Sequence, residues 1–243
     1  MKRALPFLAV ALLAGCGGSS GVSVSSTLSG GTIGGGSPTT TVGEQRRLLV
    51  LYLIDPSDHK LVAVTRSLEP TEAVGAAALR ALAEDADSEV PPNLSLKIVD
   101  GDAQVTGSLL SPAALAQVVY TLTQFPTVKT VNGKTRADVE GFVPQILVEH
   151  PTADETVTSP LHVTGNANTF EATFEYDLKD ASGKVLAHHF VTATSGSGQR
   201  GTFDFTIPFT VASEQDGTLV VFESSAEDGS RIHVREIPLT LRP

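Results

Sequence analysis

The sequence predicts two folded domains, an α/β domain followed by an all-β immunoglobulin-like sandwich. The chain has 243 residues, 41% of them hydrophobic, which suffices for two cores of about 100 residues each. Apolar residues at helical spacing occur only before residue 143. After residue 143, short alternating stretches recur between turn signals, as is typical of a sandwich.

The first 15 residues are predicted to be a lipoprotein signal peptide. Two basic residues precede an apolar run over residues 4–14, which is shorter than the about 20 residues that a membrane-spanning helix needs. The run ends in Leu13, Ala14 and Gly15, directly before the single cysteine, Cys16. This arrangement resembles a bacterial lipobox, which implies lipidation of Cys16 and cleavage before it. The alternatives are an ordinary signal peptide that contains a cysteine, or a buried N-terminal strand.

Residues 16–44 are predicted to be a flexible tether. Gly, Ser and Thr dominate this segment, and residues 17–43 carry no charge. Such a composition buries too little apolar surface to offset the entropy of ordering the chain. The expected location is therefore the extracytoplasmic face of the cell membrane, where a lipid on Cys16 holds the folded domains at the end of a spacer.

The first domain is expected over residues 45–141, with the element order ββαββαβ. Its strands are predicted at residues 48–54, 61–65, 94–99, 103–108 and 128–131. The first of these is apolar throughout, which favours a strand that is covered on both faces.

Two helices are expected in this domain. The first covers residues 71–84, and its apolar face contains Val74, Ala78 and Leu82. The second begins after Ser111, a favourable N-cap, with proline at the first helical position. Its apolar residues repeat at i, i+3, i+4 and i+7, and they are Leu115, Val118, Val119 and Leu122.

The second domain is expected over residues 144–243 as a seven-stranded sandwich. Its strands are predicted at residues 145–149, 161–166, 170–178, 185–192, 202–209, 218–224 and 232–241. A single cysteine rules out the disulfide of antibody domains, so the core must consist of aliphatic residues and phenylalanines. The phenylalanines assigned to this core are Phe170, Phe174, Phe203, Phe205 and Phe222.

The first domain resembles the GerMN domain of the spore-germination protein GerM and of LpqB-type lipoproteins. The stretches that carry this resemblance are residues 51–55, the helix at 76–82, and residues 120–126. The resemblance implies a ring-building-motif-like α/β fold.

The second domain resembles the immunoglobulin-like Gmad2 domain, which often follows GerMN. This resemblance rests on residues 159–161, 170–172 and 228–230. Together the two imply an envelope lipoprotein linked to spore germination or to envelope signalling and assembly. No catalytic residues come with either module, and sporulation itself depends on the organism.

No catalytic residue, metal site or cofactor is predicted. The Gly-x-Ser-x-Gly pattern at residues 17–21 lies in a flexible Ser/Gly run and not in a strand-to-helix elbow, and the sequence has no His-Glu-x-x-His motif. Gly133, Lys134 and Thr135 imitate the end of a P-loop, but Val128 stands where its first glycine belongs, so a turn is expected. His188 and His189 are neighbours on a strand and point to opposite faces, so they cannot chelate one ion; one is expected inward or at the flank, the other in solvent.

Two pairs of acidic residues leave an alternative open. Asp100 with Asp102, and Glu227 with Asp228, could bind calcium, although neither stretch has the ligand count of an EF-hand loop. The alternative is that they are charged, solvated ends of hairpins.

The net charge of −10 argues against a nucleic-acid binder, which needs a basic surface. The acidity is uneven, since residues 44–143 hold 13 acidic and 9 basic residues and residues 144–243 hold 14 and 6. We therefore expect a non-catalytic interaction or scaffold module whose sheet edges bind an envelope protein or a second copy of the chain.

The alternative function is binding of peptidoglycan or another wall glycan. Sugar-binding sites commonly stack aromatic rings against the ligand. The chain has no tryptophan and only three tyrosines, Tyr52, Tyr120 and Tyr176. Core packing also explains the positions of Tyr52 and Tyr120.

Overall fold

The computed structural model describes residues 46–243, which are mostly β-structure with few helices. Two clusters of buried hydrophobic side chains form its cores, one drawn mainly from residues 49–143 and the other from residues 146–241. The predicted lipobox residues Leu13, Ala14, Gly15 and Cys16, with the signal peptide and the tether, lie outside the described residues.

The first region begins with the antiparallel hairpin of β1 (Arg47–Asp55) and β2 (Lys60–Leu68). The Asp55 carboxylate accepts the backbone N–H of Ser57 at 2.8 Å and its hydroxyl at 2.7 Å, which closes the turn. Four consecutive β1 residues from Leu51 are buried, so the prediction of a strand covered on both faces is confirmed there. It is wrong for Leu48, which is exposed because it lies near the free end of the hairpin.

The remaining elements follow the predicted order. They are α1 (Val74–Glu84), β3 (Ser95–Val99), β4 (Asp102–Thr106), α2 (Pro112–Leu122) and β5 (Thr130–Val131). The strands β3, β4 and β5 form a second sheet, separate from the hairpin, in which β4 pairs antiparallel with β3 and parallel with β5.

Each helix begins where its local chemistry allows. The Ser111 hydroxyl accepts the N–H of Ala114 at 3.0 Å and caps α2 as predicted. The first helix starts at Val74 instead of residue 71, because the Thr71 hydroxyl accepts the N–H of Ala73 and holds a turn ahead of the helix.

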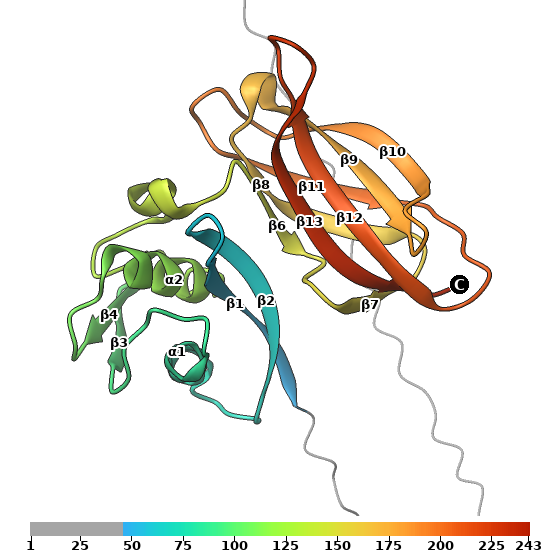
Figure 1. Cartoon of the computed structure of the whole chain (residues 1–243). Helices are drawn as coiled ribbons and strands as arrows, with labels where there is room; N and C mark the ends of the chain where they lie inside the picture. Colours follow the sequence, from blue (N-terminus) through green and yellow to red (C-terminus); the bar gives the residue numbers. More distant parts are fainter. Residues whose placement is uncertain (1–45) are drawn as a thin grey trace, which may run out of the picture. The chain divides into compact units, whose positions relative to one another are not determined.

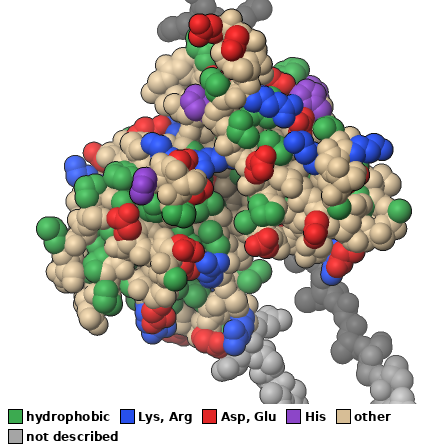
Figure 2. All heavy atoms as spheres, viewed as in Figure 1, with side chains coloured by type: hydrophobic (Ala, Val, Ile, Leu, Met, Phe, Trp, Pro, Cys, Tyr) green, Lys and Arg blue, Asp and Glu red, His purple; other side chains and the backbone are tan. Residues whose placement is uncertain are grey.

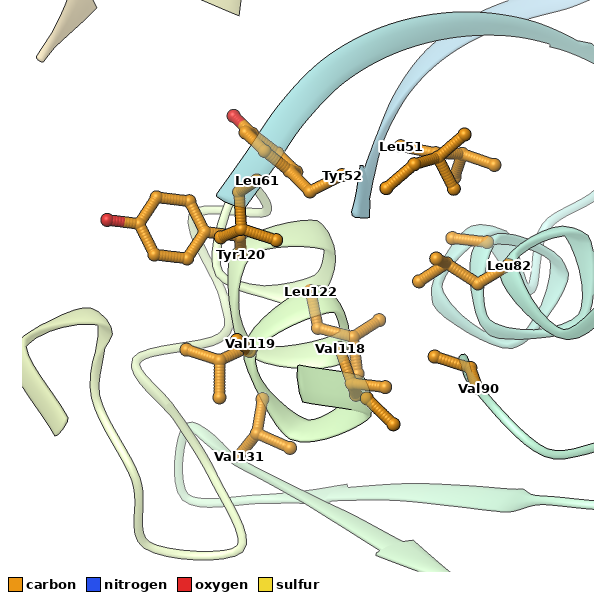
Figure 3. Close-up of a cluster of buried hydrophobic side chains, with 14 of the residues drawn as sticks. Leu51, Tyr52, Leu61, Leu82, Val90, Val118, Val119, Tyr120, Leu122 and Val131 are labelled. Atoms are coloured by element: carbon orange, nitrogen blue, oxygen red, sulfur yellow. The ribbon is translucent and has the colours of Figure 1, made fainter. Parts of the chain in front are cut away.

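The helices lie between the two sheets of this region (Figure 1). The helix α2 contacts both β1 and β5, and α1 contacts both β1 and β3. Side chains from both helices and from the hairpin converge on one core, with Leu51, Leu82 and Val118 turned toward one another (Figure 3). Because of this position α2 is buried on almost every side, so the predicted apolar stripe was too narrow.

A tight turn and a short 3-10 helix complete the first region. Asn132 and Gly133 have φ of 49° and 74°, as a tight two-residue turn requires. The 3-10 helix η1 (Arg136–Phe142) begins with a capping box in which Thr135 and Asp138 bond each other's backbone.

The second region is a two-sheet sandwich of eight strands. The strands are β6 (Ile146–His150), β7 (Glu155–Val157), β8 (Leu161–Ala167), β9 (Thr173–Asp180), β10 (Val185–Thr192), β11 (Gly201–Ile207), β12 (Gln215–Ser224) and β13 (Arg231–Leu241). One sheet has the order β10-β9-β12-β13-β7 and the other β11-β8-β6. Seven strands were predicted, and the eighth is β7, a three-residue strand that pairs parallel with β13.

Four of the five predicted core phenylalanines are buried or partly buried. Phe174 and Phe203 pack at 4.9 Å between ring centroids, with Phe205 beside them. Phe222 is also buried, and the Arg231 guanidinium lies over its ring at 3.8 Å. The prediction is wrong for Phe170, which is 60% exposed. Its segment forms the 3-10 turn η2 (Phe170–Ala172), and β9 begins only after it.

Candidate functional site

The strand β10 is an edge of the five-stranded sheet, in which it pairs only with β9. It exposes two large apolar side chains, Val185 at 44% and Phe190 at 61%. The backbone N–H of Phe190 donates to Nδ1 of His189 at 2.8 Å, so a side chain occupies this donor. This edge combines exposed apolar side chains with backbone groups of the kind that another strand pairs with.

A buried carboxylate lies beside this edge. Asp177 on β9 is 2% exposed, and its oxygens lie 2.8 Å from Nη1 of Arg231 and 2.8 Å from Nδ1 of His188. Burial raises the pKa of Asp177, but the hydrogen bonds from Arg231 and His188 outweigh it and hold that pKa below its ordinary value. The carboxylate therefore stays ionised, and its polar contacts join β9 to its neighbour β10 and, beyond β12, to Arg231 at the start of β13.

The two adjacent histidines have different partners. His188 contacts Asp177 and Glu175, while His189 accepts the backbone N–H of Phe190. Both side chains are exposed, so neither points inward, and His188 lies at the flank of the strand against the carboxylates of Glu175 and Asp177. β10 lies at the edge of its sheet, where only β9 flanks it.

A cluster of tyrosine, arginine and glutamate joins four elements of the described chain. Arg136 of η1 donates to Glu149 of β6 at 2.9 Å, and its guanidinium lies 4.4 Å from the ring centroid of Tyr120 on α2. The Tyr52 hydroxyl of β1 also donates to Glu149. Burial, with the charge of Glu149 as the second cause, raises the pKa of Tyr52 well above its ordinary value. Tyr52 and Tyr120 are buried, as core packing predicted.

In each of the two acidic pairs considered for calcium, one carboxylate accepts hydrogen bonds from nearby protein groups. Asp102 accepts the Thr130 hydroxyl at 2.6 Å and the N–H of Gly133 at 2.9 Å, and these bonds lower its pKa. Asp228 accepts the hydroxyl and N–H of Ser230, with the same effect on its pKa. Within residues 46–243, no three His, Cys, Asp or Glu side chains group in a way that could hold a metal ion.

Two further predictions concern the P-loop-like stretch and the lipidation residue. Gly133, Lys134 and Thr135 form a turn that leads into η1, which is the expected alternative to a P-loop. The lipidation residue Cys16 lies outside the described residues. Among the described helices, none is both long and apolar enough to cross a membrane.

The exposed residue that the sequence analysis missed is Phe190. The signal was present, because alternation along residues 185–192 places Phe190 on the face opposite the buried Val191. The sequence contains no comparable signal for the ion pair of Arg136 and Glu149, since nothing in the spacing of these two residues indicates that they are in contact.

The comparisons with known families match both regions. Residues 145–230 match the Gmad2 family, described as an immunoglobulin-like domain of bacterial spore germination. Residues 50–134 match the Germane family, described as sporulation and spore germination. No curated protein shows significant similarity to the chain.

Two solved structures show weak overall likeness. Tandem GerMN domains of the sporulation protein GerM from Bacillus subtilis align with 17% identity and a TM-score of 0.31, over 82% of this chain and 61% of that chain. WR4, an MSP family member from C. elegans, aligns with 15% identity and a TM-score of 0.24, over 41% of this chain and 97% of that chain. The two family matches support the conclusion that this chain is a germination-related protein with a Gmad2 immunoglobulin-like domain.

Proposed function

We propose that this protein is a lipid-anchored, non-catalytic module of the bacterial cell envelope that binds another protein along the edge of β10. The two germination families support the envelope setting. The element order ββαββαβ supports a GerMN-like α/β domain over residues 45–141, followed by the sandwich over 144–243. The single observation that carries the binding role is the exposed apolar edge of β10.

The length and the outward-pointing backbone groups of β10 suit the addition of a partner's strand to the sheet. β10 has eight residues, which is long enough for a partner segment to make several main-chain hydrogen bonds. In an edge strand, the backbone groups of alternate residues point away from the sheet and are available to a partner. Phe190, near the C-terminal end of β10, then offers an apolar contact to the added strand.

The charge of the sandwich indicates which partner fits. Residues 144–243 carry 14 acidic and 6 basic residues, and Glu175 lies on the strand next to β10. A second copy of this chain would bring the same acidic surface and be repelled. On the face that Figure 2 shows, basic side chains are interspersed with acidic ones and do not gather in a patch. We therefore expect an extended partner segment with an apolar residue between basic ones.

A photo-crosslinking residue in place of Phe190 tests this proposal in native envelopes. We expect discrete adducts to a protein, joined through an extended basic segment. The matched control carries the same crosslinker in place of Leu109, which is 97% exposed but lies outside every strand. Equal adducts at both positions, or none at residue 190, would contradict strand addition at β10. Phe190→Lys in the otherwise unmodified chain is expected to abolish binding with a change in stability of about 0.5 kcal/mol or less, because the side chain is exposed.

The lipid anchor has its own test. The wild-type chain, expressed in a bacterium with lipoprotein processing, is expected to fractionate with membranes and to carry a diacylglyceryl mass on its mature N-terminus. Cys16→Ser is expected to lose both properties, because each buried CH₂ of an acyl chain contributes about 0.8 kcal/mol to membrane binding. Mass spectrometry and fractionation provide the readout. A wild-type protein that carries a free thiol and fractionates without membranes would rule the anchor out.

A further inference from the structure

A cavity of about 530 Å³ lies beside the cluster of Arg136, Tyr120 and Glu149. Its other walls come from η1, from β8 and from the segment that leads into β11. Small-molecule sites typically have volumes of about 300–1,000 Å³, so the cavity has the size of a ligand site.

One polar group in the wall of this cavity lacks a partner. The Tyr120 side chain is fully buried, and within residues 46–243 its hydroxyl makes no hydrogen bond. Figure 3 shows this hydroxyl pointing away from the aliphatic side chains of the core. Burial raises the pKa of Tyr120 to about 12, so the hydroxyl is a neutral donor at physiological pH. A buried hydroxyl without a partner costs folding free energy, which a ligand oxygen would recover.

The charged groups of the wall are already paired with one another. Arg200 donates from Nε to both carboxylate oxygens of Glu140 at 3.0 Å, and from Nη1 to Asn166 Oδ1 at 2.9 Å. Arg136 is paired with Glu149. The two positive charges of the arginines are therefore balanced by the two negative charges of the glutamates, so the cavity favours neither an anionic nor a cationic ligand.

Donors and acceptors remain on the same wall. The Tyr120 hydroxyl and Nδ2 of Asn166 are available as donors. Glu149 receives both Tyr52 and Arg136 on Oε1, and no donor among residues 46–243 lies on Oε2, which is available as an acceptor. A ligand hydroxyl both donates and accepts, so a molecule rich in hydroxyls satisfies such a mixed set.

We propose that this cavity binds an uncharged saccharide of one or two rings, with a ring oxygen or hydroxyl accepting from Tyr120. The Arg136 guanidinium already lies over the ring of Tyr120, so recognition would depend on hydrogen bonds instead of stacking. This site is separate from the edge of β10, and neither proposal depends on the other.

Ligand-observed saturation-transfer NMR with the full chain tests the site. The probes are the disaccharide of N-acetylglucosamine, maltose and a neutral tripeptide, each at millimolar concentration. We expect saturation transfer to at least one of the saccharides and not to the tripeptide. Tyr120→Phe is expected to weaken that binding about tenfold, because it removes one donor and keeps the ring. Tyr176→Phe is the matched control, a buried tyrosine in the other core, and should bind like the wild type.

Urea denaturation of the same variants separates ligand binding from structural damage. Tyr120→Phe should be at least as stable as the wild type, because the hydroxyl that it removes has no protein partner. A clearly less stable Tyr120→Phe would mean that water or protein already satisfies this hydroxyl, and would overturn the proposal. Absence of saccharide binding by the wild type, equal binding by Tyr120→Phe, or binding of the tripeptide alone would overturn it as well.

Discussion

Replacing Gly165 by alanine is expected to destabilise the protein by about 3 kcal/mol. Gly165 lies in β8, the central strand of the three-stranded sheet, between Val148 of β6 and Phe203 of β11. A Cβ at this position would lie 2.1 Å from the carbonyl oxygen of Leu147 and 2.5 Å from Cζ of Phe203. Relief requires both a ring movement and a shift of the β6 backbone, so the pairing of β6 with β8 would suffer. Urea denaturation monitored by circular dichroism measures the cost.

Gly141→Ala is the matched control for this substitution. Gly141 is exposed, and no atom lies within 4 Å of a Cβ built on it. Its free energy of unfolding is expected to stay within about 0.5 kcal/mol of the wild type. Similar losses in both variants would show that steric conflict with Leu147 and Phe203 is not the cause.

Replacing Arg136, the cation in the cluster of tyrosine, arginine and glutamate, is expected to cause the second large loss of stability. Arg136→Met keeps an apolar stem but leaves Glu149 without its guanidinium partner and Thr123 without the donor at 2.9 Å. Breaking a buried ion pair by removing one partner typically costs about 3–5 kcal/mol, and the partial exposure of this pair favours the lower end, about 3 kcal/mol. The free energy of unfolding in urea is the measurement.

An exposed ion pair supplies the comparison for Arg136. Arg242 pairs with Glu214, and both side chains are 54% exposed. Arg242→Met is therefore expected to cost less than about 1 kcal/mol, because surface pairs contribute little. If Arg136→Met were no more destabilising than Arg242→Met, the cluster would contribute no more than a surface ion pair.

Local signals predicted many individual elements. Ser111 followed by proline placed the start of α2, because an N-cap hydroxyl and a proline at N1 act within one turn of the helix. The strand predicted at residues 185–192 has the same bounds as β10, since turn residues flank it on both sides. In both cases the interactions that decide the structure lie within a few residues of each other.

Features that depend on distant residues were not predictable in this way. β7 has three residues and exists through its parallel pairing with β13, more than eighty positions later in the chain. The alternation predicts that Phe170 belongs to a strand, yet Glu171 and Ala172 adopt φ of 53° and 59°, so β9 begins only at Thr173. The cavity is equally non-local, because it brings Tyr120 together with Asn166 and Arg200, which no sequence spacing connects.

The position of α2 between two sheets has a consequence for how the first region opens. A helix with a solvent-facing side can fray on its own, but α2 can leave its place only when β1 or β5 separates from it. Hydrogen exchange of its amides therefore reports the opening of this whole region instead of a local fluctuation. The Ser111 cap and the core around Val118 then open together, as one cooperative unit.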